Sequence, residues 1–306
     1  MSVVQRAGLA PVTLCSHVLL ASRVLMVRPA AFGFSVEAAA SNVFQRGRDE
    51  EPTGVQALAL AEFDGAVEAL RAAGVTVEVA LDNAQPAKPD AVFPNNWVSW
   101  NPDGSVILYP LALPSRRAER RREVWSWVRP GARLVDLGDL ETDGAFVEGT
   151  GSLVFDHEAR VAYACRSART TDAGVHAVCQ ALDYTPVLFD AALDGVALYH
   201  TNVALALGPG FALWFGAGAG EGRAEVEARL VASGRRIVQL SASQVRSYCG
   251  NALALRGREP VMVMSRTASD ALLDDIGRRV VLEIPTIERV GGGSARCMLA
   301  EVFEGG

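Results

Sequence analysis

The stretch GSLVFDHEARVAYACRSARTTDAGVHAVCQAL, residues 151–182, sets the pattern that the chain repeats. Two short runs rich in β-branched and aromatic residues flank a polar segment at His157, Glu158 and Ala159, which is typical of a β-hairpin. The second half of the stretch has the apolar spacing of an amphipathic helix. This stretch therefore predicts a hairpin followed by a helix.

The same order returns further along the chain. Residues 202–216, NVALALGPGFALWFG, predict another hairpin, and residues 222–234 predict the helix that follows it. Further helices are expected over residues 53–74, 116–128 and 267–277. Because hairpins recur and no linker divides the chain, we expect one α/β domain of repeated small units rather than a strict strand–helix alternation.

Composition excludes several classes of function. The 306 residues are 50% hydrophobic and carry a formal net charge of -6. The hydrophobic fraction is enough for a large core, and the acidic balance argues against a nucleic-acid partner. The one basic cluster, residues 116–125, contains Glu119 and precedes Trp127, so we interpret it as the solvated face of an amphipathic helix.

Cysteine usage and missing motifs narrow the classes further. The chain has five cysteines, an odd number, and no CxxC motif. This argues against a disulfide framework or a zinc ribbon and suits a reducing cytoplasm. No stretch reaches membrane-spanning length without charges, and neither a nucleotide fingerprint nor HExxH occurs. We therefore expect a cytoplasmic protein with no metal, cofactor or membrane partner. The sequence leaves homo-oligomer formation open.

Cys297 is the strongest candidate for chemistry. It follows the run GGGSAR, whose glycines allow a sharp turn and a close approach of a ligand to the backbone. A free cysteine is only slightly ionised at neutral pH, so a nucleophilic cysteine needs a cation or a base nearby. Arg296 is the expected cation, and His200, at the start of an apolar strand, is the best placed of the four histidines. The alternative is a small apolar residue in a C-terminal strand.

Two polar turns are further candidates. Glu148 precedes a Gly-Thr-Gly turn that leads into a strand, so it is either an exposed turn residue or a carboxylate that accepts N–H bonds from a substrate. Asn95 and Asn96 lie among apolar residues in FPNNW. They either cap a turn or present neutral amides to a polar ligand.

Taken together, these segments resemble the pentein superfamily of guanidino-group-modifying enzymes, which includes arginine deiminases, dimethylarginine hydrolases and amidinotransferases. The motifs run in the order EGTG, HTN and GGGSARC, and the match is most similar to the bacterial citrulline-utilisation hydrolases. The resemblance covers residue 22 onward. It implies a single catalytic domain over residues 22–306 after an N-terminal extension of residues 1–21. The implied fold is a five-bladed α/β propeller with pseudo-fivefold symmetry.

The resemblance also implies roles for individual residues. Cys297 is the implied nucleophile, His200 the general acid/base and Glu148 the carboxylate that holds a substrate nitrogen. Arg169 resembles the arginine that binds the substrate α-carboxylate, although Arg166 lies nearby and could take that role. Cys249 is read as structural.

The sequence departs from the deiminase pattern at positions that bear on the substrate. Asn96 and Asn202 stand where deiminases have aspartates, and Gly151 stands where they have a third. A ureido oxygen needs a donor, which Asn has and Asp lacks. We therefore expect hydrolysis of citrulline to ornithine, ammonia and carbon dioxide. Hydrolysis of arginine or dimethylarginine, amidinotransfer and a non-catalytic binding role are the alternatives.

Overall fold

The computed structural model describes residues 19–304, and within this range five groups of three strands share one pattern. Three of these units are separate sheets, and the other two are joined in one six-stranded sheet by a parallel pairing at Val302 and Trp100. In each unit the first two strands are antiparallel and the last two are parallel. One unit joins the two ends of the chain, because its first strand is the last in sequence. The units are β17 (Ala300–Val302), β1 (Arg23–Arg28) and β2 (Thr76–Leu81); β3 (Val98–Trp100), β4 (Ser105–Leu108) and β5 (Arg133–Asp136); β6 (Leu153–Asp156), β7 (Val161–Cys165) and β8 (Thr185–Phe189); β11 (Leu205–Gly208), β12 (Phe211–Trp214) and β13 (Arg236–Gln239); and β14 (Leu253–Arg256), β15 (Pro260–Ser265) and β16 (Arg279–Leu282).

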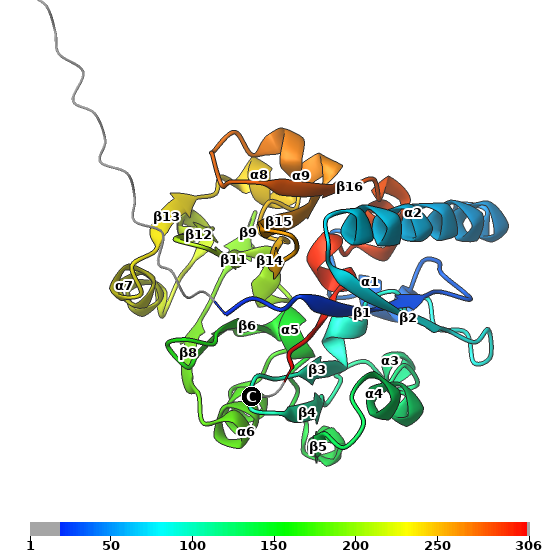
Figure 1. Cartoon of the computed structure of the whole chain (residues 1–306), viewed down its shortest axis with the longest axis horizontal. Coiled ribbons are helices and arrows are strands. Elements are labelled where there is room, and N and C mark those ends of the chain that lie inside the picture. The colour runs from blue at the N-terminus through cyan, green and yellow to red at the C-terminus, as the bar shows by residue number, and fades with distance from the viewer. Residues whose placement is uncertain (1–18, 305–306) are drawn as a thin grey trace, which may run out of the picture.

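Helices connect the second strand of each unit to the third, as parallel pairing requires. Thr171 and Ser265 cap two of these helices, each accepting a bond from a backbone N–H in the first turn. Figure 1 shows the units following one another around the middle of the molecule. The connecting helices are α1 (Val36–Ala39) and α2 (Pro52–Ala72); α3 (Pro114–Arg117) and α4 (Arg122–Val128); α6 (Asp172–Leu182); α7 (Arg223–Ala232); and α9 (Arg266–Ala271).

The predicted repeat of hairpin, helix and strand is confirmed. Residues 151–182 form β6, β7 and α6, and residues 202–234 form β11, β12 and α7. A two-stranded hairpin of β9 (Ala192–Leu193) and β10 (Val196–Ala197) stands outside the five units. The arrangement is an α/β fold, and its description as a five-bladed propeller with pseudo-fivefold symmetry stays a prediction.

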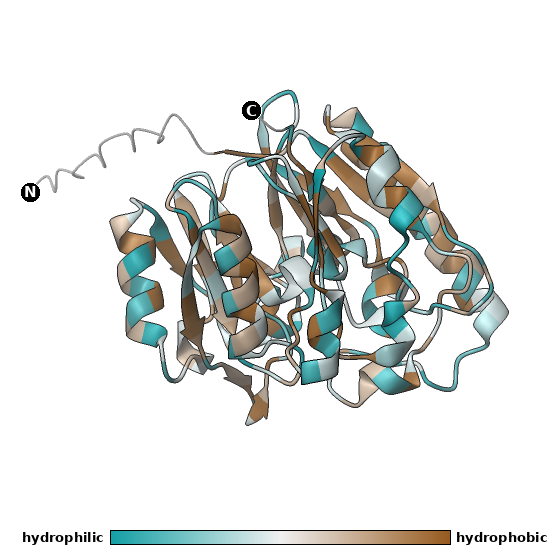
Figure 2. Cartoon of the chain, turned by 90° about the horizontal axis from the view of Figure 1, so that it is seen from below, coloured by the Kyte–Doolittle hydropathy of each residue, from teal (hydrophilic) through white to brown (hydrophobic). Residues whose placement is uncertain are grey.

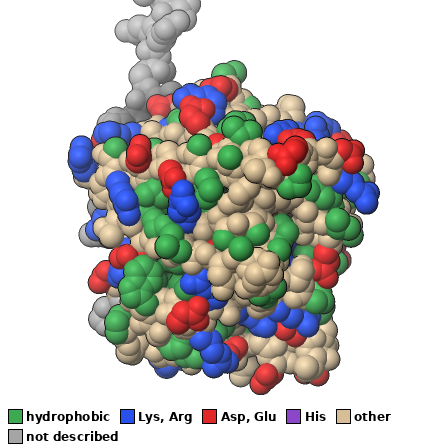
Figure 3. Space-filling view, turned by 90° about the vertical axis from the view of Figure 1, so that its right-hand side faces the viewer, with side chains coloured by type: hydrophobic (Ala, Val, Ile, Leu, Met, Phe, Trp, Pro, Cys, Tyr) green, Lys and Arg blue, Asp and Glu red, His purple; other side chains and the backbone are tan. Residues whose placement is uncertain are grey.

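Hydrophobic residues fill the space between the strands and the helices. Three tryptophans, Trp97, Trp100 and Trp214, are buried, and α2 buries Phe63 and Leu70 against its sheet. Figure 2 shows hydrophobic strands inside and the hydrophilic sides of the helices outside. On the face drawn in Figure 3, acidic and basic side chains are interspersed. In the described part of the chain, no helix combines the length and the apolar character that crossing a bilayer requires.

One expected helix is wrong, and the helix expected over residues 267–277 is shorter than predicted, because α9 ends at Ala271. Residues 116–128 do not form one helix, because the chain leaves the helical path between α3 and α4. Arg116 and Glu119 are buried rather than solvated, so the basic cluster is only partly a solvent-facing surface. Of the predicted N-terminal extension, residues 1–18 lie outside the described range, together with Cys15 and His17. The boundary of the catalytic domain stays a prediction.

Candidate active site

Short turns directly before the first strand of each unit supply the polar residues at the centre of the molecule. Asn96, Glu148, His200, Asn251 and Cys297 each lie two to five residues before the first strand of a different unit. Because the units surround the centre, residues that are far apart in sequence meet there (Figure 1). The turns are η1 (Pro94–Asn96) before β3, α5 (Gly149–Ser152) before β6, η3 (Thr201–Val203) before β11, the segment after α8 (Ala242–Arg246) and before β14, and η6 (Ala295–Met298) before β17.

Glycines allow these turns to pack against one another. A Cβ atom on Gly151 would lie 2.5 Å from Nδ2 of Asn96 and 2.7 Å from Nδ1 of His200. Gly292 has φ +66 and lies against Asn42, so the chain turns there in a conformation that favours glycine. The sequence-based expectation that glycines bring the backbone close to the site is therefore confirmed for these positions.

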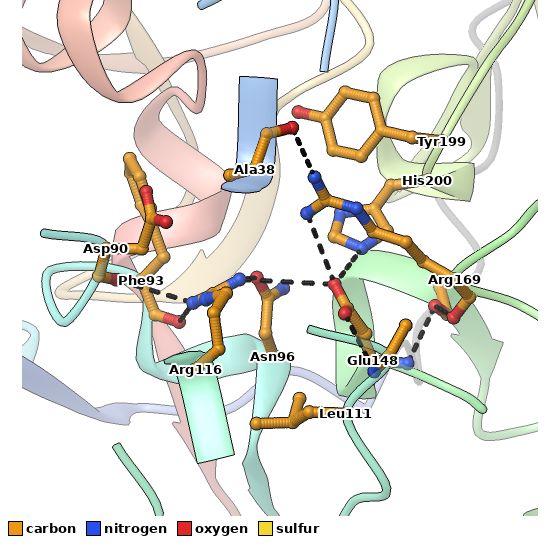
Figure 4. A network of polar contacts seen from close by, with 12 residues as sticks. Ala38, Asp90, Phe93, Asn96, Leu111, Arg116, Glu148, Arg169, Tyr199 and His200 are labelled. Carbon is orange, nitrogen blue, oxygen red and sulfur yellow. Dashed lines mark hydrogen bonds and ion pairs between the residues drawn. The ribbon is translucent and has the colours of Figure 1, made fainter. Parts of the chain in front are cut away.

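Glu148 and His200 form a buried acid–histidine pair. His200 Nε2 lies 2.9 Å from Oε2 of Glu148, and Arg169 Nη1 lies 3.5 Å from the same oxygen. Figure 4 shows these contacts converging on the Glu148 carboxylate. Burial opposes its ionisation, but Arg169, His200 and Arg116 outweigh burial and lower the pKa of Glu148 to about 2.

His200 is the neutral partner of this pair at neutral pH. Burial lowers its pKa to about 4, and the bond to Glu148 opposes that shift. Because an ionised carboxylate can only accept, the proton of the neutral ring lies on Nε2. Nδ1, beside Gly151, then carries a lone pair and can act as a base. The pair can thus accept and return a proton.

Cys297 lies in η6 and is only 4% exposed. Its sulfur accepts hydrogen bonds from two amides, at 3.2 Å from Asn251 Nδ2 and at 3.6 Å from Asn202 Nδ2. The amide oxygens of both asparagines have no partner among the described residues. An unpaired buried oxygen costs about 1–3 kcal/mol, so these amides are oriented at the expense of stability.

Arg296 is not the cation that the sequence suggested for this sulfur. Its guanidinium bonds to Glu301 at 2.8 Å and to the backbone oxygen of Leu299 at 2.8 Å. It lines a separate cavity together with Asp156 and Arg235, whereas Cys297 and His200 line the central one. Proximity in sequence misled the prediction, because η6 sends neighbouring side chains in different directions.

Asn95 and Asn96 are buried, as the interpretation of a polar ligand site requires. Asn96 accepts a bond from Arg116 on Oδ1 and donates to Asn95 Oδ1 at 3.1 Å. Arg116 in turn pairs with both oxygens of Glu119, at 2.8 Å and 3.0 Å. Burial raises the pKa of Glu119 to about 7, and Arg116 opposes that rise. Arg116 therefore fixes which way the Asn96 amide faces.

Arg116 is a site residue that sequence reasoning missed. The spacing of Arg116 and Glu119, three residues apart in the basic cluster, was the available signal. On the sequence alone both residues belong to a solvated helix face, because long polar side chains are usually solvated.

The structure separates the two candidate arginines. Arg169 is buried, lies 5.0 Å above the Tyr199 ring and donates to Ser41 Oγ and to the backbone oxygen of Ala38. Arg166 instead pairs with two aspartates at the surface. Arg169 alone of the two lines the central cavity. Its role toward a carboxylate stays a prediction.

Asp90 is a second residue that the sequence argument passed over. It is buried, lines the central cavity and lies in the same PDAVFPNN segment as Asn96. Burial raises its pKa, although Arg116 and Arg169 act against the rise. One carboxylate therefore remains near the position where the sequence suggested that carboxylates are missing.

The cavity itself is small. Asn42 closes one side by donating to the backbone oxygen of Gly292 at 3.1 Å, and Tyr199 donates to the same oxygen at 2.9 Å. Within residues 19–304, no group of three acidic, histidine or cysteine side chains is arranged to hold a metal ion. The lining residues are Ala38, Asn42, Asp90, Phe93, Asn96, Arg116, Arg169, Tyr199, His200, the three glycines 291–293 and Cys297.

Solved structures of similar fold include guanidino-group enzymes. The N-terminal domain of ArgZ, an arginine dihydrolase of cyanobacteria solved with substrate bound, matches with a TM-score of 0.73 at 18% identity, over 92% of this chain and 98% of that one. Apo ArgZ matches with a TM-score of 0.74 at 19% identity, and the chain spans 40% of its length. DDAH from Pseudomonas aeruginosa in complex with citrulline matches with a TM-score of 0.65 at 17% identity, over 92% of this chain and 100% of that one. These likenesses show the fold.

The family comparison is more direct. Residues 28–304 match the family described as N,N dimethylarginine dimethylhydrolase, eukaryotic. No curated protein sequence matches the chain. The resemblance inferred from the motifs is confirmed at the level of the superfamily. The chain therefore belongs to the N,N dimethylarginine dimethylhydrolase family and is a C–N hydrolase of the guanidino-group-modifying pentein superfamily.

Proposed function

We propose that the protein hydrolyses the ureido group of a small amino acid, citrulline in the first place, to ornithine, ammonia and carbon dioxide. The observation that carries this proposal is the set of neutral amides at the centre of the site. Asn96 lines the cavity, and Asn202 and Asn251 donate to the sulfur of Cys297. Amide N–H groups suit an uncharged ureido oxygen, whereas a guanidinium is held best by carboxylates.

In the proposed mechanism the Cys297 thiolate attacks the ureido carbon. Charge develops on the ureido oxygen, where N–H donors stabilise it. His200 takes up the proton that the Cys297 thiol loses on ionising and passes it to the departing nitrogen, and the ionised Glu148 stabilises the ring while it carries the proton. A thioester-like intermediate remains on the sulfur.

Water completes the reaction. His200 takes a proton from water, which attacks the carbonyl carbon of the intermediate and releases the thiolate. If ornithine leaves first, the released carbamate decomposes to ammonia and carbon dioxide. If ammonia leaves first, the carbamate of ornithine decomposes to the same products, so the overall balance does not depend on the order.

Arg169 is the proposed anchor for the substrate α-carboxylate. Its planar fork matches a carboxylate, and two of its partners, Ser41 Oγ and the Ala38 oxygen, are neutral acceptors that an anion can replace while Nη1 stays beside Glu148. The five units, taken as the blades of a propeller, would then place the amino-acid end of the substrate beside α1 and its ureido end beside Cys297.

Arginine is the second candidate substrate, because Asp90 offers a carboxylate in the same cavity and Glu148 a second one next to it. Two of the structural neighbours are described as an arginine dihydrolase and a DDAH. A guanidinium could pair with these carboxylates. The retained Asp90 weakens the argument that carboxylates are absent from the site.

The test offers L-citrulline, L-arginine and dimethylarginine separately and identifies products by mass spectrometry. The proposal expects ornithine and ammonia from citrulline, at a higher kcat/KM than for either guanidino substrate. Cys297→Ala should abolish turnover and retain the fold. Citrulline as the end product from arginine or dimethylarginine, with no turnover of citrulline, would overturn the proposal in favour of the second candidate.

A further inference from the structure

We propose that Asn251, together with Asn202, holds Cys297 as a thiolate, so that the nucleophile is ready for a substrate that brings no positive charge. This inference rests on the proposed function, in which Cys297 attacks an uncharged ureido group. Asn251 precedes the unit of β14, β15 and β16, and with it each of the five units contributes a polar residue to the centre.

The contact with the sulfur is direct. Nδ2 of Asn251 lies 3.2 Å from Sγ of Cys297, and the side chain of Asn251 is buried. Asn202 adds a longer bond of 3.6 Å from another unit. Two N–H donors therefore point at one sulfur from different units. A thiol is a weak acceptor, whereas a thiolate accepts several hydrogen bonds readily, so this arrangement favours the ionised form.

A tight turn keeps the Asn251 amide in place. The backbone N–H of Asn251 donates to the Tyr248 oxygen at 2.8 Å, and Tyr248 has φ 61. The hydroxyl of Tyr248 donates to the backbone oxygen of Glu288 at 2.9 Å, which ties this turn to the segment that leads to Cys297. Gly250 packs against the backbone of Val203, beside Asn202. The two amides are thus held by adjoining turns.

The cations of the site are committed to other groups. Arg296 pairs with Glu301, Arg116 with Glu119, and Arg169 lies beside Glu148. A guanidinium substrate would bring its own positive charge to a thiolate, but a ureido substrate cannot. The hydrogen bonds from the Asn251 and Asn202 amides supply the stabilisation of the thiolate that an uncharged substrate cannot.

The other titratable groups near the sulfur do not replace these donors. Tyr199 and Tyr248 are buried, which raises their pKa values, so both stay neutral. His200, Asp90, Arg116 and Arg169 line the same cavity, and Glu148 and Glu119 pair with them. These groups are common to wild type and Asn251 variants, so a difference between those proteins reports on Asn251.

The test measures how fast iodoacetamide alkylates Cys297 as a function of pH, with the modified peptide identified by mass spectrometry. Asn251→Leu removes the donor, and Asn251→Asp replaces it with an anion of the same shape. Loss of a hydrogen bond to a charged group should move the pH of half-maximal alkylation upward by about one unit in Asn251→Leu, and further in Asn251→Asp. Below that pH, alkylation of Asn251→Leu should be roughly tenfold slower than in wild type. Asn101→Leu, at a buried asparagine that bonds only within its own hairpin, is the matched control.

Alkylation needs no turnover, so this test is independent of the identity of the substrate. Equal alkylation profiles in wild type and in both folded Asn251 variants would overturn the inference, even if citrulline is hydrolysed. Shifted profiles without turnover of citrulline would support the thiolate role and count against the proposed substrate. If Asn251→Leu and Asn251→Asp do not fold, Asn251→Ser provides a smaller change, for which the same upward shift is expected.

Discussion

Replacing Asn96 by aspartate should change which substrate the enzyme prefers. Asn96 uses Oδ1 to accept from Arg116 and one N–H to donate to Asn95. The variant Asn96→Asp keeps an acceptor for Arg116 but loses both N–H groups. It also adds a negative charge to a cavity that already contains Asp90. The cavity of the Asn96→Asp variant therefore favours a guanidinium and disfavours a ureido oxygen.

The structure indicates that the fold tolerates this change. Nδ2 of Asn95 has no partner among the described residues, so the Asn95 amide can turn over and donate to the new carboxylate. For citrulline, the loss of one neutral hydrogen bond costs about 0.5–1.5 kcal/mol, and a guanidinium gains about 1.5–3 kcal/mol from a charge-assisted bond. The ratio of kcat/KM for arginine to that for citrulline should therefore rise roughly 30- to 2000-fold.

The assay measures kcat/KM of wild type and Asn96→Asp for both substrates, with products identified by mass spectrometry and folding checked by thermal unfolding. Asn101→Asp, at a buried asparagine outside the cavity, controls for burying a new carboxylate. An unchanged substrate ratio in a folded Asn96→Asp protein would refute the reasoning. It would mean that Asn96 does not face the reacting group of the substrate.

Three further changes test the site. Glu148→Gln removes the negative charge that raises the pKa of His200, so the acidic limb of the profile of kcat/KM against pH should move to lower pH. Turnover should fall by at least about 100-fold. An acidic limb that does not move would show that it does not report the titration of His200. Folding stability should fall as pH drops from about 6.5 to 4, because only the unfolded chain protonates His200 in that range. It should fall again from about 4.5 to 2, because there only the unfolded chain protonates Glu148. Denaturant titrations of wild type and Glu148→Gln should differ between about pH 4.5 and 2. Gly151→Ala would press a methyl group against His200 and Asn96 and should lower kcat by roughly 100-fold. The control Gly65→Ala, on the exposed face of α2, should leave kcat unchanged. Equal activity of the two variants would contradict the packing described for Gly151.

Local patterns predicted most of the secondary structure because they depend on neighbours in sequence. Runs of β-branched and aromatic residues predicted β6 and β7, and the helical spacing of apolar residues predicted α6. The same reasoning failed at residues 116–128, where Arg116 and Glu119 satisfy each other inside the protein. A buried ion pair cannot be told from a solvated one by composition, since the difference lies in what packs around it.

Candidate residues with distinctive motifs were easier to identify than their partners. Glu148, His200 and Cys297 stand in short motifs, and the structure brings Glu148 and His200 into contact and places Cys297 in the same cavity as His200. Asp90 and Asn251 have no distinctive setting in the sequence, and each depends on a contact with a different unit. Their roles became visible only once the units were placed around one centre.

The sequence by itself determined the repeating hairpin and helix, the family and the three residues that the motifs single out. Strand and helix periodicity is a local property, and motif residues keep their order along the chain. Tertiary structure alone decided that Arg296 turns away from Cys297, that Arg116 orients Asn96, and that two amides face the sulfur. The two amides reach the sulfur from other units, and Arg116 reaches Asn96 from a distant part of the same unit, so these contacts follow from tertiary packing and not from any spacing along the chain.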